Sequence, residues 1–482
     1  MILNVLLPVA ALLVAASAAP PVDDEPLERA LDSITAEKIR SDLEFIASDE
    51  MAGRDSPSPE LKIAARYIRA RLMRLGFEPG ARGESYLDEW RHALWGHDET
   101  RTWLQITGKD GLSMSPTWGE GYFLPKDAFG VREVSGKALW AGTFDAKKLD
   151  KLKVRGRWVV GQPKKGISGK RLTQLEKNGA VGVVVLPKAK RREPVAKTFE
   201  STLSDFRGTS LKGLRGGTPR GDGFPVVHLN EALGKRLLGA IDDPDVGDDL
   251  GMEISESCGY GRLDDAVLEN VIGIWPGSDA RLKKEVIILS AHYDHVGEGP
   301  DGAVFNGADD NGSGTCGLMA IAEALAEYGP MRRTVMLMWV SAEERGLLGS
   351  AAWTKNPYLP KGMKPLCNIN IDMIGRNKKD EFLITPTKSH PAYSALTKVA
   401  EANAKKEGFR KIKSADSYWK RSDHANFSEN LGIPVAFLFC DVHEDYHETT
   451  DTTEKIDFDK MRRICRLVVR MLEALQIDEP KF

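Results

Sequence analysis

Apolar and polar positions follow one pattern throughout the second half of the chain. After Leu268, short apolar runs such as residues 285–292, 334–341 and 433–440 alternate with longer segments, 317–329 and 460–475, that have a helical character. Short apolar runs bounded by turn residues are typical of strands buried on both faces. Strands that alternate with helices predict an α/β fold with a mostly parallel, mixed sheet and helices on both faces.

Two other patterns precede this one. Residues 35–76 predict two amphipathic helices, the second with Leu61, Ala64, Ile68, Leu72 and Leu75 on one side and Gly76 as a stop signal. Between about residues 118 and 250, short β-like runs are separated by loops rich in Gly, Pro, Lys and Arg. We therefore expect three parts: 33–117, a separate β-rich module over 118–250, and 251–482.

The composition is that of an ordinary globular protein. Of 482 residues, 41% are hydrophobic and 28% charged, and the net charge of -3 shows no bias toward nucleic acid or anionic membranes. Residues 1–19 match a secretory signal peptide with an A-x-A cleavage motif ending at Ala18, which implies export without a stable membrane span. No Lys or Arg precedes the apolar run, so an uncleaved anchor is the alternative. The five cysteines lack metal-site spacing, and a disulfide framework is not expected.

Acids and histidines follow each predicted core strand of the last region. Ligands of parallel α/β sheets bind beyond the carboxyl ends of the strands, so these side chains are expected at one edge. They are His292, Asp294, Asp309, Asp310, Glu343, Glu344, Asp372, His443 and His447.

Taken singly, each of these residues has an ordinary explanation as a turn or helix cap. Together, however, four or five strand ends with mixed imidazole and carboxylate groups would repel one another without a cation. Two imidazoles and three carboxylates suit Zn²⁺, and five ligands suit two ions that share a carboxylate and a water or hydroxide. One of the adjacent acids, Glu343 and Glu344, would then bind metal and the other act as general base. Asp294 is placed to orient the ring of His292.

The motifs that carry these residues resemble peptidase family M28, in particular its exported aminopeptidases with an inserted protease-associated (PA) domain. They are SAHYDHVG, NGADDNGSG, SAEERGLLGS, NIDMIGR and YHETTDT, in the family's order, with DLEFIASDEMAGR near the amino end. The resemblance implies the zinc-dependent exopeptidase fold, a PA-like module over 118–250, and removal of N-terminal residues from peptides.

The resemblance also assigns roles to residues. Two zinc ions are expected per chain, bridged by Asp309; His292 and Asp372 complete one site, and Glu344 and His447 complete the other. Glu343 is the expected general base. The family tends to have a cis peptide after the bridging aspartate, here expected between Asp309 and Asp310.

Substrate contacts are expected from a loop, residues 417–427, that resembles the family's segment before the last core strand. Tyr418 and Trp419 compete as donors to the substrate carbonyl, and Ser422 and Asp423 are expected to cap a turn or helix. His295 and His443 are interpreted as structural or supporting residues.

Two alternative activities stay open. A carboxypeptidase would need a cation for the terminal carboxylate, and Arg376 and Arg421 are the candidates. A glutaminyl cyclase-like enzyme would use one zinc ion and close a ring instead of cleaving a chain. The sequence does not determine the oligomeric state.

Overall fold

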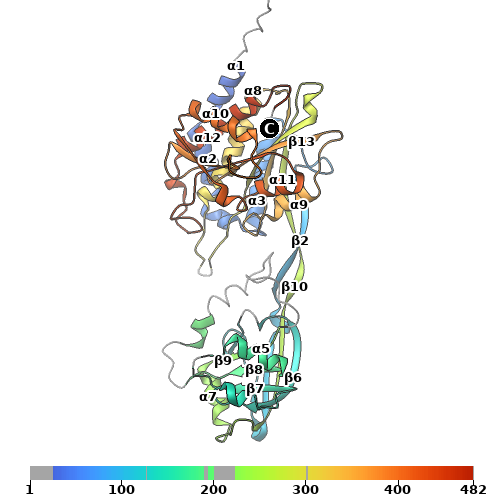
Figure 1. Ribbon diagram of the computed structural model, residues 1–482, viewed down its shortest axis with the longest axis vertical. Helices are drawn as coiled ribbons and strands as arrows, with labels where there is room; N and C mark the ends of the chain where they lie inside the picture. The colour runs from blue at the N-terminus through green and yellow to red at the C-terminus, as the bar shows by residue number, and fades with distance from the viewer. Residues whose placement is uncertain are drawn as a thin grey trace, which may run out of the picture.

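The computed structural model describes residues 25–125, 128–164, 166–188, 194–199, 223–299 and 302–480. The expected signal peptide, residues 1–19, lies outside this range. Figure 1 shows a larger body that carries most helices and a smaller body, joined by the long strands β2 and β10. Among the described residues, no helix combines the length and apolar character that a membrane crossing requires.

The helices have the following bounds: α1 (Glu25–Ser33), α2 (Ala36–Ile46), α3 (Pro59–Leu75), α4 (Ala146–Leu149), α5 (Gly169–Lys177), α7 (Glu231–Gly239), α8 (Gly314–Tyr328), α9 (Leu348–Lys355), α10 (Ala395–Ala404), α11 (His424–Leu431) and α12 (Phe458–Ala474). The strands are β1 (Glu78–Pro79), β2 (Leu87–His97), β3 (Trp103–Gly108), β4 (Ser113–Met114), β5 (Tyr122–Phe123), β6 (Val131–Trp140), β7 (Arg157–Gly161), β8 (Gly182–Val185), β9 (Val226–Leu229), β10 (Asp249–Trp275), β11 (Glu285–His292), β12 (Thr334–Val340), β13 (Lys364–Asp372), β14 (Glu381–Thr385), β15 (Lys411–Ser414) and β16 (Val435–Phe439).

The larger body contains the predicted mixed sheet. Strands β12, β11, β13 and β16 are parallel neighbours, whereas β10 and β14 pair antiparallel at either side of them. The register pairs His292 with Val340 and Asp372 with Phe439. The ends of these four strands therefore meet at one edge, as the sequence predicted.

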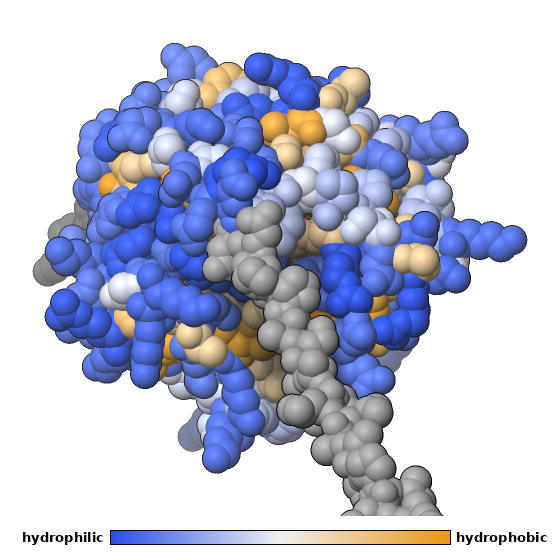
Figure 2. All heavy atoms as spheres, turned by 90° about the horizontal axis from the view of Figure 1, so that it is seen from above, coloured by the Kyte–Doolittle hydropathy of each residue, from blue (hydrophilic) through white to orange (hydrophobic). Residues whose placement is uncertain are grey.

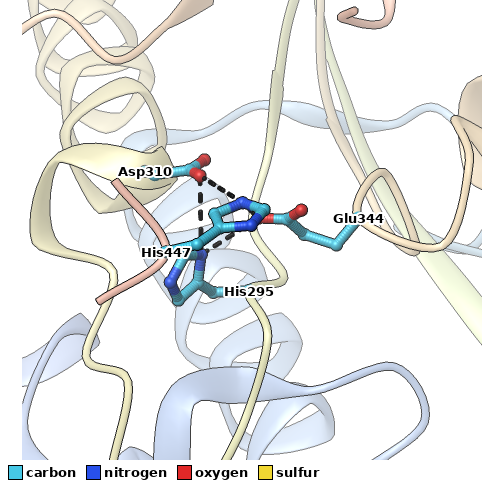
Figure 3. A group of neighbouring side chains, drawn as sticks. All are labelled: His295, Asp310, Glu344 and His447. Carbon is cyan, nitrogen blue, oxygen red and sulfur yellow. Dashed lines mark hydrogen bonds and ion pairs between the residues drawn. The ribbon is translucent and has the colours of Figure 1, made fainter. Parts of the chain in front are cut away.

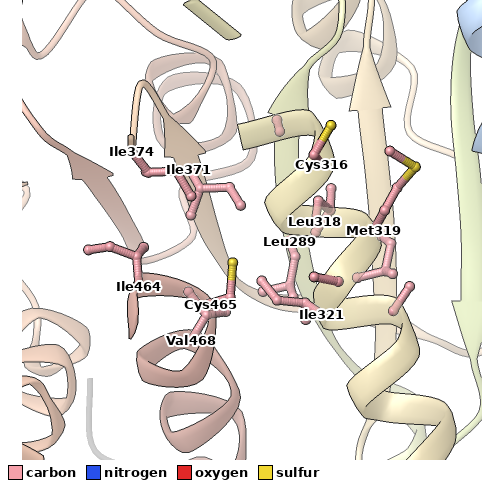
Figure 4. Close-up of a cluster of buried hydrophobic side chains, with 14 of the residues drawn as sticks. Leu289, Cys316, Leu318, Met319, Ile321, Ile371, Ile374, Ile464, Cys465 and Val468 are labelled. Carbon is pink, nitrogen blue, oxygen red and sulfur yellow. The ribbon is translucent and has the colours of Figure 1, made fainter. Parts of the chain in front are cut away.

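Helices cover both faces of this sheet. In β12, Leu337 and Trp339 face one core with α1, α2, α3, α8, α10 and α12, while Met336 and Met338 face a second core with α9 and α11. Figure 4 shows α8 and α12 side by side in the first core, where Sγ of Cys465 lies 3.6 Å from the backbone carbonyl of Gly317. All five cysteines are buried and free. On the face seen in Figure 2, hydrophilic residues dominate and hydrophobic ones form small groups, as expected of a surface in contact with water.

The predicted helix 59–75 has recognisable boundaries. The side chain of Ser58 accepts a hydrogen bond from the backbone N–H of Leu61 (3.0 Å), which caps the first turn. Gly76 ends the helix with a φ of +81°, a conformation that glycine adopts without a steric penalty.

The smaller body is built on a sheet in which β6, β7, β8 and β9 are parallel and the first half of β10 pairs antiparallel with β6. Its core reaches from Leu104 to Tyr260. The expected boundaries at residues 118 and 250 thus fall inside this body. The sequence did not reveal β10, whose 27 residues run through both sheets, because three exposed residues, 262–264, two of them charged, interrupt its pattern of buried positions.

Candidate metal centre

Four side chains converge beyond the carboxyl edge of the main sheet (Figure 3). They are His295, Asp310, Glu344 and His447. Nε2 of His447 lies 3.0 Å from Oδ2 of Asp310 and 3.1 Å from Oε1 of Glu344. Nδ1 of His295 lies 3.0 Å from the same Oε1 and 3.8 Å from Oδ2 of Asp310. Nitrogen and oxygen atoms from four separate segments therefore surround one point.

A second group shares Asp310 with the first. Nε2 of His292 lies 3.5 Å from Oδ1 of Asp310 and 3.4 Å from Oδ1 of Asp372. Oδ1 of Asp372 is buried and receives no hydrogen bond from the described residues. The two oxygens of Asp310 thus face different groups, as a carboxylate that bridges two cations would.

These distances fit metal coordination. Ligands about 2.1 Å from a tetrahedral zinc ion are roughly 3.4 Å from one another, and the distances of 3.0–3.8 Å in the first group and 3.4–3.5 Å in the second lie around that value. Imidazole and carboxylate are the ligands of catalytic zinc sites. The residues present can hold two ions with Asp310 between them.

The clustered carboxylates of the centre are stabilised by positive charge. Burial raises the pKa of Asp310 to about 6, and the nearby charge of Glu344 adds to this rise. Burial disfavours the charged form of His447, yet its hydrogen bonds with Asp310 and Glu344 outweigh this effect and raise its pKa to about 10. Protons on imidazole thus provide the compensation that metal ions would provide when bound.

The prediction that Asp309 lies between the two groups is wrong by one position, because Asp310 lies there. Oδ1 of Asp309 accepts a hydrogen bond from the backbone N–H of Gly375 (2.6 Å), and its Oδ2 lies 3.3 Å from Nε2 of His443, outside both groups. The cis peptide bond likewise lies one position later than expected, between Asp310 and Asn311.

Asp451, in the motif that also carries His447, positions the segment that contains Asp310. Its carboxylate accepts hydrogen bonds from the backbone N–H groups of Asp309 (3.0 and 3.1 Å) and Asp310 (3.1 Å). Charge-assisted bonds of this kind hold a loop in one conformation. No pattern in the sequence distinguishes Asp451 as a supporting residue.

Asp294 supports more of the centre than its predicted partner, His292. Its backbone carbonyl lies 3.2 Å from Nδ1 of His292, whereas its carboxylate Oδ1 is 3.7 Å from that nitrogen. The carboxylate accepts the backbone N–H groups of Glu343 (3.1 Å) and Glu344 (3.3 Å). Asp294 therefore fixes the adjacent glutamates as well as the histidine.

Glu343 and Glu344 play different parts. Glu344 lies in the first group, whereas Glu343 lines the adjoining cavity with Oε2 4.0 Å from Nε2 of His292. Burial raises the pKa of Glu343 well above its usual value. Burial would also raise the pKa of Glu344, but hydrogen bonds from His295 and His447 hold it well below the usual range. One acid is ready to bind a cation, and the other to accept a proton.

The cavity next to the centre has an apolar wall and a polar rim. Met373, Phe437, Phe439 and Val442 line it together with Tyr418, Arg421 and Tyr446. Of the two competing side chains in the loop 417–427, Tyr418 therefore reaches the cavity. Trp419 instead packs against His390 and His424.

Arg376, a candidate for substrate binding, does not reach the cavity. Its Nη2 donates to Oδ2 of Asp445 (2.8 Å), and its Nη1 lies 3.9 Å from Asp451. Internal carboxylates bind this arginine, and it is not among the residues that line the cavity, so the geometry does not favour its predicted substrate contact.

The side chains of Ser422 and Asp423 do not cap a helix as expected, because both bind other polar side chains. The hydroxyl of Ser422 donates to Oδ2 of Asp372 (2.7 Å), which orients that carboxylate toward His292. Asp423 precedes α11 but makes no side-chain cap; it accepts the Ser350 hydroxyl, and burial raises its pKa to about 7.

The buried Arg54 ties the loops of the centre together. Its guanidinium donates to four backbone carbonyls: those of Ile46 (2.6 Å), Tyr293 (3.0 Å), Asn306 (2.8 Å) and Gly307 (3.0 Å). One of these carbonyls, that of Tyr293, directly follows His292, and two, those of Asn306 and Gly307, lie in the loop before Asp310. The motif DLEFIASDEMAGR in the sequence therefore ends on a residue that supports the metal loops.

Comparison with known proteins agrees with this geometry. The model of peptidase family M28 matches residues 270–472, the segment that contains the complete centre. Over this segment the chain is similar to peptidase family M28.

Related sequences share the M28 region. A probable leucine aminopeptidase of Arthroderma otae is 31% identical over 229 residues, which are 43% of this chain and 60% of that protein. Leupeptin-inactivating enzyme 1 of Streptomyces exfoliatus is 31% identical over 192 residues, 39% of this chain and 38% of that protein. The matched region thus spans less than two thirds of these relatives.

Two solved structures have a fold similar to that of almost the whole chain. An aminopeptidase from Aneurinibacillus sp. strain AM-1 aligns with a TM-score of 0.54 at 17% identity over 95% of this chain and 98% of that one. A zinc aminopeptidase from Bacillus subtilis aligns with a TM-score of 0.50 at 18% identity over 92% and 95% of the two chains. At such identities the likeness concerns the fold.

Proposed function

We propose that this protein is a dinuclear zinc aminopeptidase that hydrolyses the first peptide bond of peptides. The observation that carries this proposal is the position of Asp310, whose two oxygens face separate groups of ligands while Glu343 lines the cavity beside them. The similarity to leucine aminopeptidases and to a zinc aminopeptidase supports the activity and the metal.

The first ion would be held by His295, Asp310, Glu344 and His447, and the second by His292, Asp310 and Asp372. Bound zinc supplies positive charge that lowers the pKa of water and polarises the carbonyl to be attacked. The group around His292 offers three protein ligands and borders the cavity, so an ion held there would be reachable by water or substrate.

Glu343 is the general base of the proposed reaction. It lines the cavity, and the hydrogen bond from its backbone N–H to Asp294 fixes its place. A carboxylate with a raised pKa accepts a proton from the attacking water more readily than an ordinary one does, and then returns it to the leaving amine. Asp294 acts as a positioning residue.

Tyr446 fits the role of oxyanion donor better than Tyr418. The hydroxyl of Tyr418 donates to Oδ1 of Asp441 (3.0 Å), so its proton is already used. The hydroxyl of Tyr446 accepts a hydrogen bond from Nη2 of Arg421 (3.1 Å), which leaves its own proton for a substrate oxygen. Burial raises the pKa of Tyr446 and keeps that proton in place.

The proposal is tested by mass spectrometry of octapeptides incubated with the zinc-loaded protein. Free, N-acetylated and C-amidated forms of each peptide are compared. Stepwise loss from free amino ends, blocked by acetylation and unaffected by amidation, is the expected result. Loss from the carboxyl end would instead indicate the carboxypeptidase, and ring closure of N-terminal glutamine without cleavage would indicate the cyclase.

Two further properties belong to the proposal. The resemblance of residues 1–19 to a signal peptide supports export of the protein. The smaller body, with its parallel strands β6–β9, is proposed to be the PA-like module. None of the residues in the two ligand groups comes from it, so any effect of this body on activity acts through substrate access.

A further inference from the structure

Arg421 differs from the other cations that surround the centre. Arg376 is bound to Asp445, Arg345 is bound to Asp55, and Lys460 donates to the backbone carbonyls of Arg376 and Lys378. Within the described residues, none of the observed ion pairs involves Arg421, although it lines the same cavity as Glu343. Among the described residues that line this cavity, it is the one arginine or lysine.

Two tyrosines hold this guanidinium in place. Its carbon lies 5.6 Å from the ring centre of Tyr418 and 5.7 Å from that of Tyr446, and Nη2 donates to the Tyr446 hydroxyl (3.1 Å). Aromatic faces orient a guanidinium without neutralising its charge. An arginine has five N–H donors in a planar fork, so this single bond leaves most of them available.

The rest of the cavity explains what such a cation is suited to bind. Asp310, Glu343 and Asp372 make the inner end acidic, and Phe437, Phe439 and Val442 make the wall apolar. A substrate carboxylate near these acids would be repelled unless a fixed cation met it, and the guanidinium fork matches a carboxylate in two parallel hydrogen bonds.

We propose that Arg421 binds a carboxylate of the substrate, so that the enzyme favours short peptides with a nearby free C-terminus or peptides with an acidic side chain next to the cleaved bond. This inference rests on the proposed aminopeptidase activity. It goes beyond that activity because it selects a class of substrate.

The test compares kcat/KM for carboxylate and neutral versions of the same small substrate. Leu-Gly against Leu-Gly-amide probes the terminal carboxylate, and Leu-Glu-amide against Leu-Gln-amide probes a side chain in the second position. Glu-Gly-amide against Gln-Gly-amide probes the first side chain. For at least one pair, the wild-type protein should prefer the carboxylate about ten-fold, mainly through KM. The substrate pair that shows the preference identifies whether the carboxylate is the C-terminus, the second side chain or the first side chain.

Variants separate this role from a general effect on the site. Arg421→Gln should reduce the preference to about one, whereas any loss that acts through the Tyr446 hydroxyl should fall equally on the carboxylate and neutral substrates, and Arg421→Lys should restore part of the preference. Lys420→Gln is the matched control, because Lys420 is the neighbouring cation and pairs with Glu429 (3.6 Å); it should keep the preference.

Three results would overturn the inference. Equal hydrolysis of both members of all three pairs by the wild-type protein, or an equal loss of both members in Arg421→Gln, would refute carboxylate binding while the aminopeptidase activity stands. A failure to cleave any substrate in the series would refute the proposed function, and this inference with it.

Discussion

The imidazole Nε2 of His447 lies 3.0 Å from Oδ2 of Asp310, although the two residues follow different strands, β16 and β11, in the main sheet. The parallel order of β11, β13 and β16 carries both residues to the same edge. This pair joins the loop before α8 to the last loop of the centre. Oδ2 of Asp310 thereby faces the first ligand group, while its Oδ1 faces His292 in the second.

Replacing Glu343 should separate metal binding from turnover. Glu343→Gln removes the proton acceptor but none of the atoms in the two ligand groups, so we expect kcat to fall about 10²–10⁴-fold with metal content unchanged. Steady-state kinetics and elemental analysis of the same sample measure both quantities. Retention of kcat would exclude Glu343 as the base.

The two tyrosines of the cavity should differ in effect. Tyr446→Phe removes the hydroxyl proton that is free for a substrate oxygen, and kcat should fall about 10²–10³-fold. Tyr418→Phe is the matched control, because the Tyr418 hydroxyl already donates to Asp441; its kcat should change far less. A larger loss in Tyr418→Phe would reverse the assignment.

His295 should contribute to metal affinity. Because its Nδ1 lies 3.0 Å from Oε1 of Glu344 and belongs to the first ligand group, His295→Ala should weaken binding of one zinc ion about 10–100-fold, measured by competition with a chelator. His92→Ala, at a histidine outside both groups, should leave the affinity unchanged. An unchanged affinity in His295→Ala would show that this ring plays no part in the centre.

Arg54 should stabilise the fold and the metal loops together. Arg54→Met leaves four backbone carbonyls without their donor, so unfolding by denaturant should show a loss of about 3 kcal/mol in the free energy of unfolding. Arg74→Met, at an exposed position of α3, should change it by less than about 0.5 kcal/mol. Equal stability of the two variants would contradict the role of Arg54.

The sequence predicted the sheet edge and its residues well because short apolar strands are a strong local signal. Strands β11 and β12 begin where the apolar runs begin, and the residues that follow them gather as expected. Glycine, by contrast, marks the loop before α8 without showing which of the adjacent acids faces inward. There Asp310 adopts a non-helical backbone (φ -98°, ψ 103°). The periodicity of a helix therefore does not predict which way the side chains of Asp309 and Asp310 point.

The sequence also could not predict the roles of side chains whose contacts lie far away along the chain. Arg54 is separated from Asn306 and Gly307 by more than 250 positions, and only the folded chain shows that it donates to their carbonyls. Arg376 and Arg421 look equivalent in the sequence, since both stand beside site motifs. Internal carboxylates bind Arg376, whereas two tyrosines hold Arg421.

The most direct test of the account is the zinc content of two neighbouring variants, measured by native mass spectrometry. The wild-type protein should bind two zinc ions, Asp310→Ala should lose both, and Asp309→Asn, which keeps an acceptor for the N–H of Gly375, should retain both. Two ions in Asp310→Ala together with none in Asp309→Asn would contradict the account and return the bridging role to Asp309.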